Sequence, residues 1–203
     1  MECNTIREFA YDACTPNVGG IRNIWLANYV ENAATLHIVE SEGDNKLVGG
    51  SVKGFAEGVT WAKYPMRKNT CSMTSTLNNS TDGASYVTTE LALVFSKMEA
   101  KKRIAIQALA IGECMAVVED SNGEMWFLGA DAPLTANNGG GETGTQKGDA
   151  NRYNLTLLDE SYGFPYSLDE SAKAIVKGST YTGGSTNGGG TDDGGSGTGG
   201  NPL

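Results

Sequence analysis

The alternation of apolar and polar residues along the chain predicts a protein built mostly of β-strands. The runs IRNIWLANYV, ATLHIVE, KLVGGSVKGF and VTWAKYPMRK are rich in β-branched and aromatic residues, and turn-forming clusters lie between them. The stretch ASYVTTELALVF is longer and places Val87, Leu91 and Phe95 on one side, and RYNLTLLD alternates in the same way. We therefore expect a mainly β fold with mostly antiparallel pairing.

The period changes after Phe95, where the spacing predicts a helix over residues 97–111. Ser96 and Glu99 have the spacing of a capping box, and Gly112 provides a stop signal. Apolar residues recur at helical spacing between these two signals, so the helix is expected to pack on a sheet. The later segment SLDESAKAIVKG is too short to decide between a helix and an irregular strand.

Residues 114–129 read as a β-hairpin, with CMAVVED and EMWFLG as its two strands. Asn122 and Gly123 tolerate the positive φ angles of tight hairpin turns. Glu119 and Asp120 flank this turn, and we interpret them as solvated turn residues rather than as a catalytic pair. The next segment, residues 130–151, shows no periodicity and reads as a long loop, either mobile or ordered by contact with something else.

The hairpin carries bulky apolar side chains on both faces, and the run at residues 24–26 does the same. A sheet with one wet face should alternate instead. Each large apolar side chain gains about 1.5 to 3 kcal/mol on full burial, so a second layer must cover the other face. The helix at 97–111 and a neighbouring subunit are equal alternatives for Trp126. The candidate subunit-contact residues are Trp25, Leu26, Met125, Trp126, Phe127 and Leu128.

Composition divides the 203-residue chain into two parts. Residues 1–177 contain the apolar runs and form the expected β-rich domain. Residues 178–203 are rich in glycine and cannot bury enough apolar area to offset the entropy of ordering, so we expect a flexible tail. The net charge is −9, and no basic block stands out beyond Lys101, Lys102 and Arg103. Tight phosphate binding needs clustered cations, so this charge pattern disfavours it.

The inventory of reactive side chains is poor, and no enzyme activity is expected. His37 is the single histidine, and Cys3, Cys14, Cys71 and Cys114 lack the spacing of a zinc site. No nucleotide-binding loop is present, so we expect no catalytic, cofactor-binding or metal-binding residues. The sequence also shows no secretory signal and no run of about 18 apolar residues, so synthesis in a reducing cytoplasm without membrane insertion is expected.

Four segments in order resemble the phage tail tube proteins, also called major tail proteins. They are NVGGIRNIWLANYV, TDGASYVTTELALVFSKMEAKKRIAIQALAIG, VVEDSNGEMWFLGAD and ETGTQKGDANRYNLTLLD, and together they cover most of residues 17–159. The glycine-rich C-terminus departs from the family pattern.

The resemblance implies a β-sandwich or barrel of tail-tube type with one flanking helix. It implies that six copies form a ring, that rings stack into a tube for genome delivery, and that other tail proteins are partners. DNA would pass through the lumen without specific binding. The protein would be located in the virion tail after assembly in the host cytoplasm. The alternative is a capsid-associated or adhesive β-domain, displayed through its glycine-rich tail.

Overall fold

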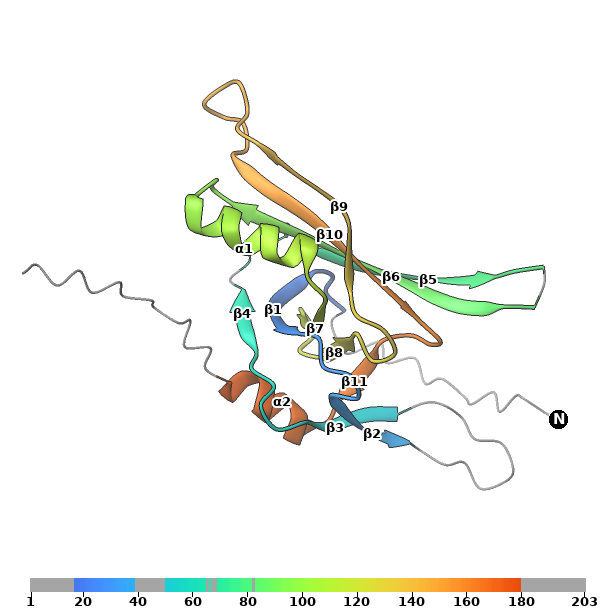
Figure 1. The fold of residues 1–203 in the computed structure, drawn as a ribbon. Helices are drawn as coiled ribbons and strands as arrows, with labels where there is room; N and C mark the ends of the chain where they lie inside the picture. Colours follow the sequence, from blue (N-terminus) through green and yellow to red (C-terminus); the bar gives the residue numbers. More distant parts are fainter. Residues whose placement is uncertain (1–16, 39–49, 65, 67–68, 82, 180–203) are drawn as a thin grey trace, which may run out of the picture.

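The computed structural model describes residues 17–38, 50–64, 66, 69–81 and 83–179, and it is mainly β with two sheets and two helices (Figure 1). The first sheet contains, in spatial order, β2 (Ala34–Ile38), β3 (Gly50–Phe55), β11 (Tyr166–Leu168), β8 (Met125–Leu128), β7 (Cys114–Asp120), β1 (Ile21–Asn28) and β4 (Ala62–Tyr64). The second contains β5 (Ser72–Asn79), β6 (Ser85–Ser96), β10 (Arg152–Ser161) and β9 (Thr135–Glu142).

The expectation of mostly antiparallel pairing is confirmed for the four-stranded sheet, but the seven-stranded sheet is mixed. There, β11 pairs in parallel with β3 and antiparallel with β8. Both sheets keep two edge strands among the described residues, so they do not close into a barrel. The expectation of one helix is wrong, because α1 (Ala100–Ile111) is joined by α2 (Glu170–Gly178).

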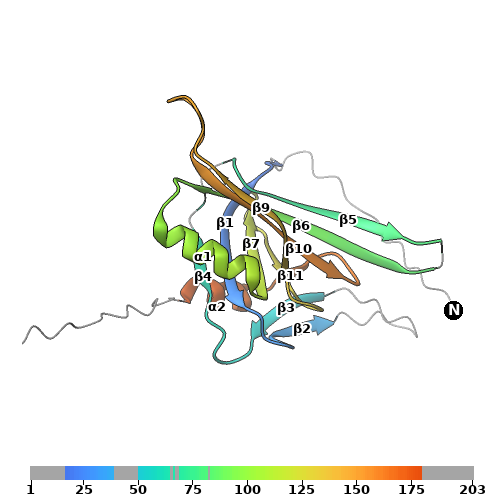
Figure 2. The same ribbon diagram turned by 45° about the horizontal axis from the view of Figure 1, so that its top comes forward.

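The two sheets pack face to face across one apolar cluster. The seven-stranded sheet contributes one face of β1, β7 and β8, including Leu26 and Leu128, and the four-stranded sheet contributes Leu91 and Leu157. The β10 strand pairs with β6 along its whole length, from Arg152 opposite Ser96 to Ser161 opposite Val87. This long pairing gives the second sheet the extended shape that is visible in Figure 2.

A second apolar cluster covers the opposite face of the seven-stranded sheet. Trp25 and Phe127 on that face pack with Trp61, and α2 adds Ala172 and Val176, both fully buried. Trp61 and Phe127 meet edge to face, with ring centroids 6.4 Å apart. The short segment whose conformation the sequence left open is therefore the helix that closes this face.

Three strands were missed by the sequence analysis: the short β11 and both edge strands of the four-stranded sheet. The polar run SMTSTLNN forms β5, which pairs with β6 from Ser72 to Asn79. The run TANNGGGE, expected to be part of a long loop, forms β9 against β10. Neither of these two edge runs alternates strongly in hydropathy. Their strand conformation depends instead on hydrogen bonds with the neighbouring strand. The predicted runs also extend into residues 39–49, 65 and 67–68, which lie outside the described residues.

The capping box predicted at the start of α1 does not form. Ser96 belongs to β6, and Glu99 is the N-cap without a side-chain capping bond. The turn between β6 and α1 is instead shaped by Lys97, which has a φ of 66°. Asn151 also holds this turn, because it accepts hydrogen bonds from the amides of Lys97 and Met98. The predicted stop at Gly112 is confirmed, because its amide donates to the carbonyl of Ala108.

Candidate functional site

Five of the six candidate subunit-contact residues lie in the core of a single chain. Leu26 and Leu128 face the four-stranded sheet, whereas Trp25, Met125 and Phe127 face α2 and Trp61. All five are at most 3% exposed. The premise that one chain is too small to cover both faces is wrong, because the second sheet covers one face and α2 with Trp61 covers the other. These five side chains are not available to a neighbour.

Trp126 is the sixth candidate, and it remains half-buried. It lies opposite Val118 across the hairpin, on the same side of β8 as Leu128. Its indole nitrogen donates a hydrogen bond to Asp120 Oδ2 at 3.1 Å, which satisfies the only polar atom of the ring. The ring itself stays partly exposed, so a neighbouring subunit can still cover this side chain.

Asp120 holds the hairpin turn, as expected for an acidic turn residue. Its Oδ1 accepts the amides of Asn122 and Glu124 at 2.9 and 3.0 Å. Its own amide donates to the carbonyl of Glu124, so three residues form the loop. Among them only Gly123 has a positive φ, of 97°, which corrects the expectation that Asn122 shares this conformation.

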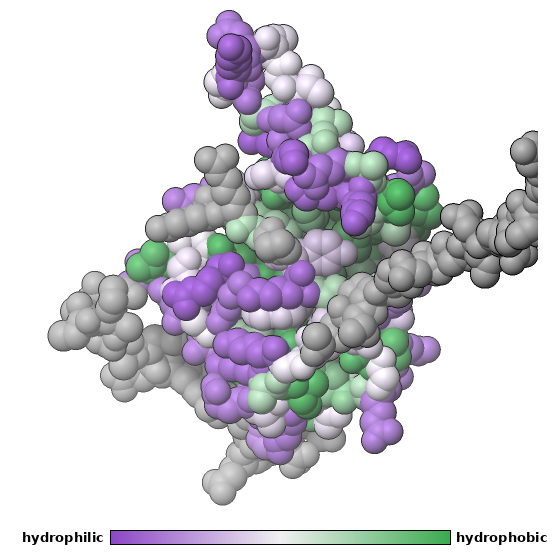
Figure 3. Space-filling view, turned by 90° about the vertical axis from the view of Figure 1, so that its left-hand side faces the viewer, coloured by the Kyte–Doolittle hydropathy of each residue, from purple (hydrophilic) through white to green (hydrophobic). Residues whose placement is uncertain are grey.

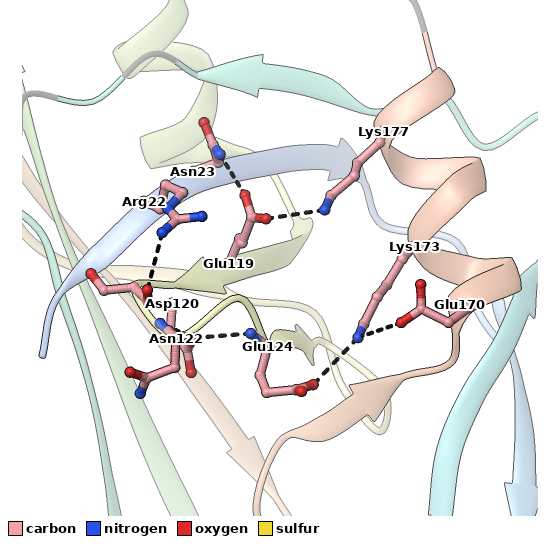
Figure 4. Close-up of polar contacts among 10 residues, drawn as sticks. Arg22, Asn23, Glu119, Asp120, Asn122, Glu124, Glu170, Lys173 and Lys177 are labelled. Carbon is pink, nitrogen blue, oxygen red and sulfur yellow. Dashed lines mark hydrogen bonds and ion pairs between the residues drawn. The ribbon is translucent and has the colours of Figure 1, made fainter. Parts of the chain in front are cut away.

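Glu119 is buried rather than solvated, which corrects the sequence interpretation. Its carboxylate lies between Asn23 of β1, which donates to Oε2, and Lys177 of α2, whose Nζ is 3.0 Å from Oε1 (Figure 4). Burial alone would raise the pKa of Glu119, but the bonds from Asn23 and Lys177 lower it below its usual value. Next to it, Lys173 bonds to Glu124 and Glu170. These polar contacts fasten α2 to the β7–β8 hairpin.

The four-stranded sheet presents the features that suit assembly. Its outermost strands, β5 and β9, each have eight residues and each pair with one neighbour only among the described strands. Unpaired strand edges carry free amide and carbonyl groups, and these pair readily with another chain. Both edges lack the inward charges and prolines that commonly block such pairing.

A groove of about 450 Å³ runs beside the free edge of β9, between this strand and α1. Its apolar lining includes Ile106 and Ala110 of α1 and Tyr153 and Leu155 of β10. On β5, at the other edge of the sheet, Leu77 faces the same side of the sheet but is 50% exposed. The β9 edge therefore lies next to an apolar groove, and the β5 edge carries an exposed leucine.

The outer face of the four-stranded sheet is polar and acidic. Alternation along the paired strands places three carboxylates there, from Glu90, Glu142 and Glu160, and one cation, Arg152. Arg152 is bonded to Glu142, so the net charge of this face is −2, from three negative groups and one positive group. The uncharged part of the face includes threonine and asparagine side chains together with four apolar or aromatic ones, namely Thr74, Thr76, Asn78, Thr88, Asn138, Asn154, Thr156, Tyr86, Ala92, Val94 and Leu158.

One carboxylate is buried between the sheets without full compensation. Asp159 is 2% exposed, and its Oδ2 accepts a long bond of 3.4 Å from the amide of Gly129, while its Oδ1 has no partner. Burial raises the pKa of Asp159 to about 6, the Gly129 amide opposes this shift, and the negative charge of Asp131 adds to it. The sequence analysis did not mark this residue, although continued alternation in RYNLTLLD places position 159 on the inward side, where an apolar residue is expected.

The side chains with reactive chemistry lie apart from one another. His37 is exposed on the edge strand β2, and Cys71 and Cys114 are buried in the core as free thiols. Cys3 and Cys14 lie outside the described residues. Within the described residues, no group of three or more His, Cys, Asp or Glu side chains could hold a metal ion, and neither helix is long and apolar enough to cross a membrane.

Comparison of the chain with protein-family models, with curated proteins and with solved structures finds no match.

Proposed function

We propose that this chain is a structural protein of a phage tail, whose copies join through the edges of the four-stranded sheet into rings that stack as a tube. The proposal rests on the resemblance of residues 17–159 to tail tube proteins and on one observation of the fold. This observation is a single sheet that combines two free edges with an acidic, threonine-rich outer face.

Pairing of β5 in one copy with β9 in the next would extend the sheet from chain to chain. The two strands have equal length, and side chains of β5 such as Leu77 would enter the groove between β9 and α1. Because β5 and β9 are different surfaces, this contact is heterologous, and it closes into a ring when the rotation between copies allows it. We propose six copies, as the resemblance implies.

The outer face of the extended sheet would line the bore. Its net charge of −2 per copy repels phosphate groups, and hydroxyl and amide groups cover much of the remainder. DNA therefore passes such a wall without the cation clusters that make binding tight. Under this proposal the protein resides in the virion tail, is assembled in the host cytoplasm, and contacts further tail proteins at the tube ends.

A pair of variants on β5 tests the proposed edge contact. Leu77→Lys places a charge where the side chain should enter the apolar groove of the neighbour, and we expect the concentration for half-maximal assembly to rise by about tenfold or more. Leu77 is already half-exposed, so the variant should fold.

Thr76→Lys is the control, because it adds the same charge on the same strand but faces the bore. We expect it to form rings at the concentration of the unmodified chain, measured by light scattering and negative-stain microscopy. Equal assembly of both lysine variants and the unmodified chain would count against pairing between β5 and β9.

A further inference from the structure

The described part of the chain ends beside the wall of a groove. Ser179 follows α2, and its Oγ accepts a hydrogen bond of 2.9 Å from the amide of Trp61. The sequence neighbours of Trp61, Thr60 and Ala62, both line a groove between α1 and β4. Figures 1 and 2 both show α1, β4 and α2 on the same side of the molecule. The chain therefore leaves the described structure directly next to the groove lining.

This groove has a volume of about 690 Å³ and is open to solvent. Its rim includes Val30, which is 43% exposed, and Glu113 adds a carboxylate. Figure 3 shows this side of the molecule, where apolar surface (green) lies between hydrophilic side chains (purple). A cleft of this size accommodates a ligand larger than one aromatic side chain. The other apolar side chains of the lining include Leu26, Val59, Ala62, Ala105, Ala108 and Leu109.

The sequence after Ser179 supplies one aromatic side chain within reach of this groove. Residues 180–203 lie outside the described residues and read TYTGGSTNGGGTDDGGSGTGGNPL. Tyr181 is the only aromatic residue among them, and it comes two residues after Ser179. Two residues span at most about 7 Å, so the ring of Tyr181 can reach past Thr60 and Ala62 into the groove. Attachment through so short a segment also gives the ring a high effective concentration there.

The N-terminal segment also contains apolar residues, but it joins the described structure far from the groove. The amide of Val18 donates to Asn122 in the turn of the β7–β8 hairpin. The groove lies at the other end of β1, where Asn28 is part of its lining. The 8 residues of β1 separate these two points by about 26 Å. The segment that follows Ser179 is therefore the nearer occupant.

We propose that Tyr181 binds in the α1–β4 groove of its own chain and anchors the start of the glycine-rich C-terminus there. The ring contacts the apolar lining at Ala62 and Ala108, and the hydroxyl donates to the carboxylate of Glu113. Such a bond fits the chemistry of tyrosine, whose hydroxyl usually has a partner when the ring is buried. The inference concerns a single chain and does not rest on the proposed function.

The anchor determines on which side of the molecule the glycine-rich segment begins. Ile106 and Leu109 of α1 pack against the apolar cluster between the two sheets. The helix therefore lies on the side of the four-stranded sheet that is opposite to its acidic face. With Tyr181 in the groove, residues 182–203 begin away from that face, which in the proposed tube means away from the bore.

Photo-crosslinking identifies where residue 181 binds. A benzophenone amino acid replaces Tyr181 in the full chain, and this chain is mixed at low concentration with an isotope-labelled chain that lacks the probe. We expect crosslinks to residues 58–64 and 105–113 of the same chain. Crosslinks to the labelled chain, crosslinks to any other surface, or no crosslinks would overturn the inference.

A variant that fills the groove is the matched test of the same contact. Ala108 is exposed and lines the groove, so Ala108→Trp should fold and should abolish the crosslinks from position 181. Ala100→Trp adds the same side chain to α1 outside the groove and should leave the crosslinks unchanged. Crosslinks that persist in Ala108→Trp would show that the groove is not the binding site.

Hydrogen exchange measures the contribution of the ring to the stability of α1 without a probe. Tyr181→Ser should speed amide exchange in residues 105–112 by about tenfold, because the helix loses an apolar contact. Thr182→Ser, one residue further along, should leave the exchange rates unchanged. Equal rates in Tyr181→Ser and the unmodified chain would contradict the anchor. Both measurements are made on the monomer, so they do not depend on whether rings form.

Discussion

Glu119 and Asp159 are both buried carboxylates, and their surroundings affect them in opposite ways. Glu119 has a donor on each oxygen, and its pKa is lowered despite burial. Asp159 has one long hydrogen bond and one oxygen without a partner, and burial raises its pKa to about 6. The first carboxylate stabilises the attachment of α2, whereas the second costs stability when it is ionised.

Replacement of Asp159 by Asn should stabilise the domain near neutral pH. The folded pKa of about 6 lies above the ordinary value of 3.8, so the unmodified protein is most stable with this group protonated and loses stability as pH rises through 6. The shift of roughly two units corresponds to about 3 kcal/mol. Urea unfolding between about pH 4 and pH 7 should show this loss in the unmodified protein and not in Asp159→Asn.

Asp131→Asn is the control for this prediction, because Asp131 is exposed and contributes only a neighbouring charge. It should leave most of the pH dependence in place. Identical stability profiles for the unmodified protein and Asp159→Asn would show that Asp159 is compensated in solution.

Two glycines with similar φ angles differ in the space around them. Gly129 has a φ of 93°, and an added Cβ would lie 2.9 Å from Cβ and 3.2 Å from Cα of Met115. Gly123 has a φ of 97° and nothing within 4 Å. We expect Gly123→Ala to cost about 1 kcal/mol from backbone strain alone, and Gly129→Ala to cost about 3 kcal/mol, because core overpacking adds to the strain.

Chemical denaturation of the two alanine variants measures this difference. If Gly129→Ala destabilises the protein no more than Gly123→Ala, then β7 moves freely away from the loop after β8.

Among the elements, the strongly alternating strands were predictable from sequence and the elements defined by tertiary contacts were not. The strands β1, β7 and β8 fall within the predicted runs, and most residues of β6 and β10 do so too. The edge strands β5 and β9 escaped, because glycine, asparagine and threonine do not alternate in hydropathy and the strand state depends on a partner. Gly139 and Gly141 allow β9 to lie close against Leu155 and Tyr153, where a Cβ would come within 3.1 Å.

The candidate contact residues were misassigned for a related reason. The sequence shows that both faces of the sheet need a cover, with Phe127 on one face and Leu128 on the other, and this requirement is correct. It does not show which segment supplies the cover, because α2 spans only nine residues and its apolar face includes just two fully buried side chains. A parallel pairing between β3 and β11 brings α2 onto the sheet, and this long-range contact has no local signal.

The role of α2 as the cover predicts different effects for two adjacent positions. Val176 is fully buried against the Trp61 cluster, whereas Ile175 is 44% exposed. Val176→Asp places an unpaired charge in the core and should cost several kcal/mol, enough to lower the melting temperature by more than about 10 °C. Ile175→Asp adds the same charge at the protein surface and should shift the melting temperature by only a few degrees. Thermal melting with tryptophan fluorescence distinguishes the two, and equal shifts would show that α2 does not cover this face.

At the scale of the whole molecule, the surfaces left uncovered are those that assembly would use. The broad apolar faces of the seven-stranded sheet are satisfied within one chain, so self-association does not depend on them. The four-stranded sheet has two free edges, an apolar groove between one of them and α1, and an exposed leucine on the other. This distribution differs from the sequence-based hypothesis, in which the hairpin itself contacts the neighbour.

Negative-stain microscopy of the purified chain over a range of concentrations is the most direct test of the central claim. We expect rings, and at higher concentration stacked tubes, formed by the unmodified chain and by Thr76→Lys but not by Leu77→Lys at the same concentrations. A monodisperse monomer at every concentration, with both edges of the four-stranded sheet left unpaired, would contradict the account.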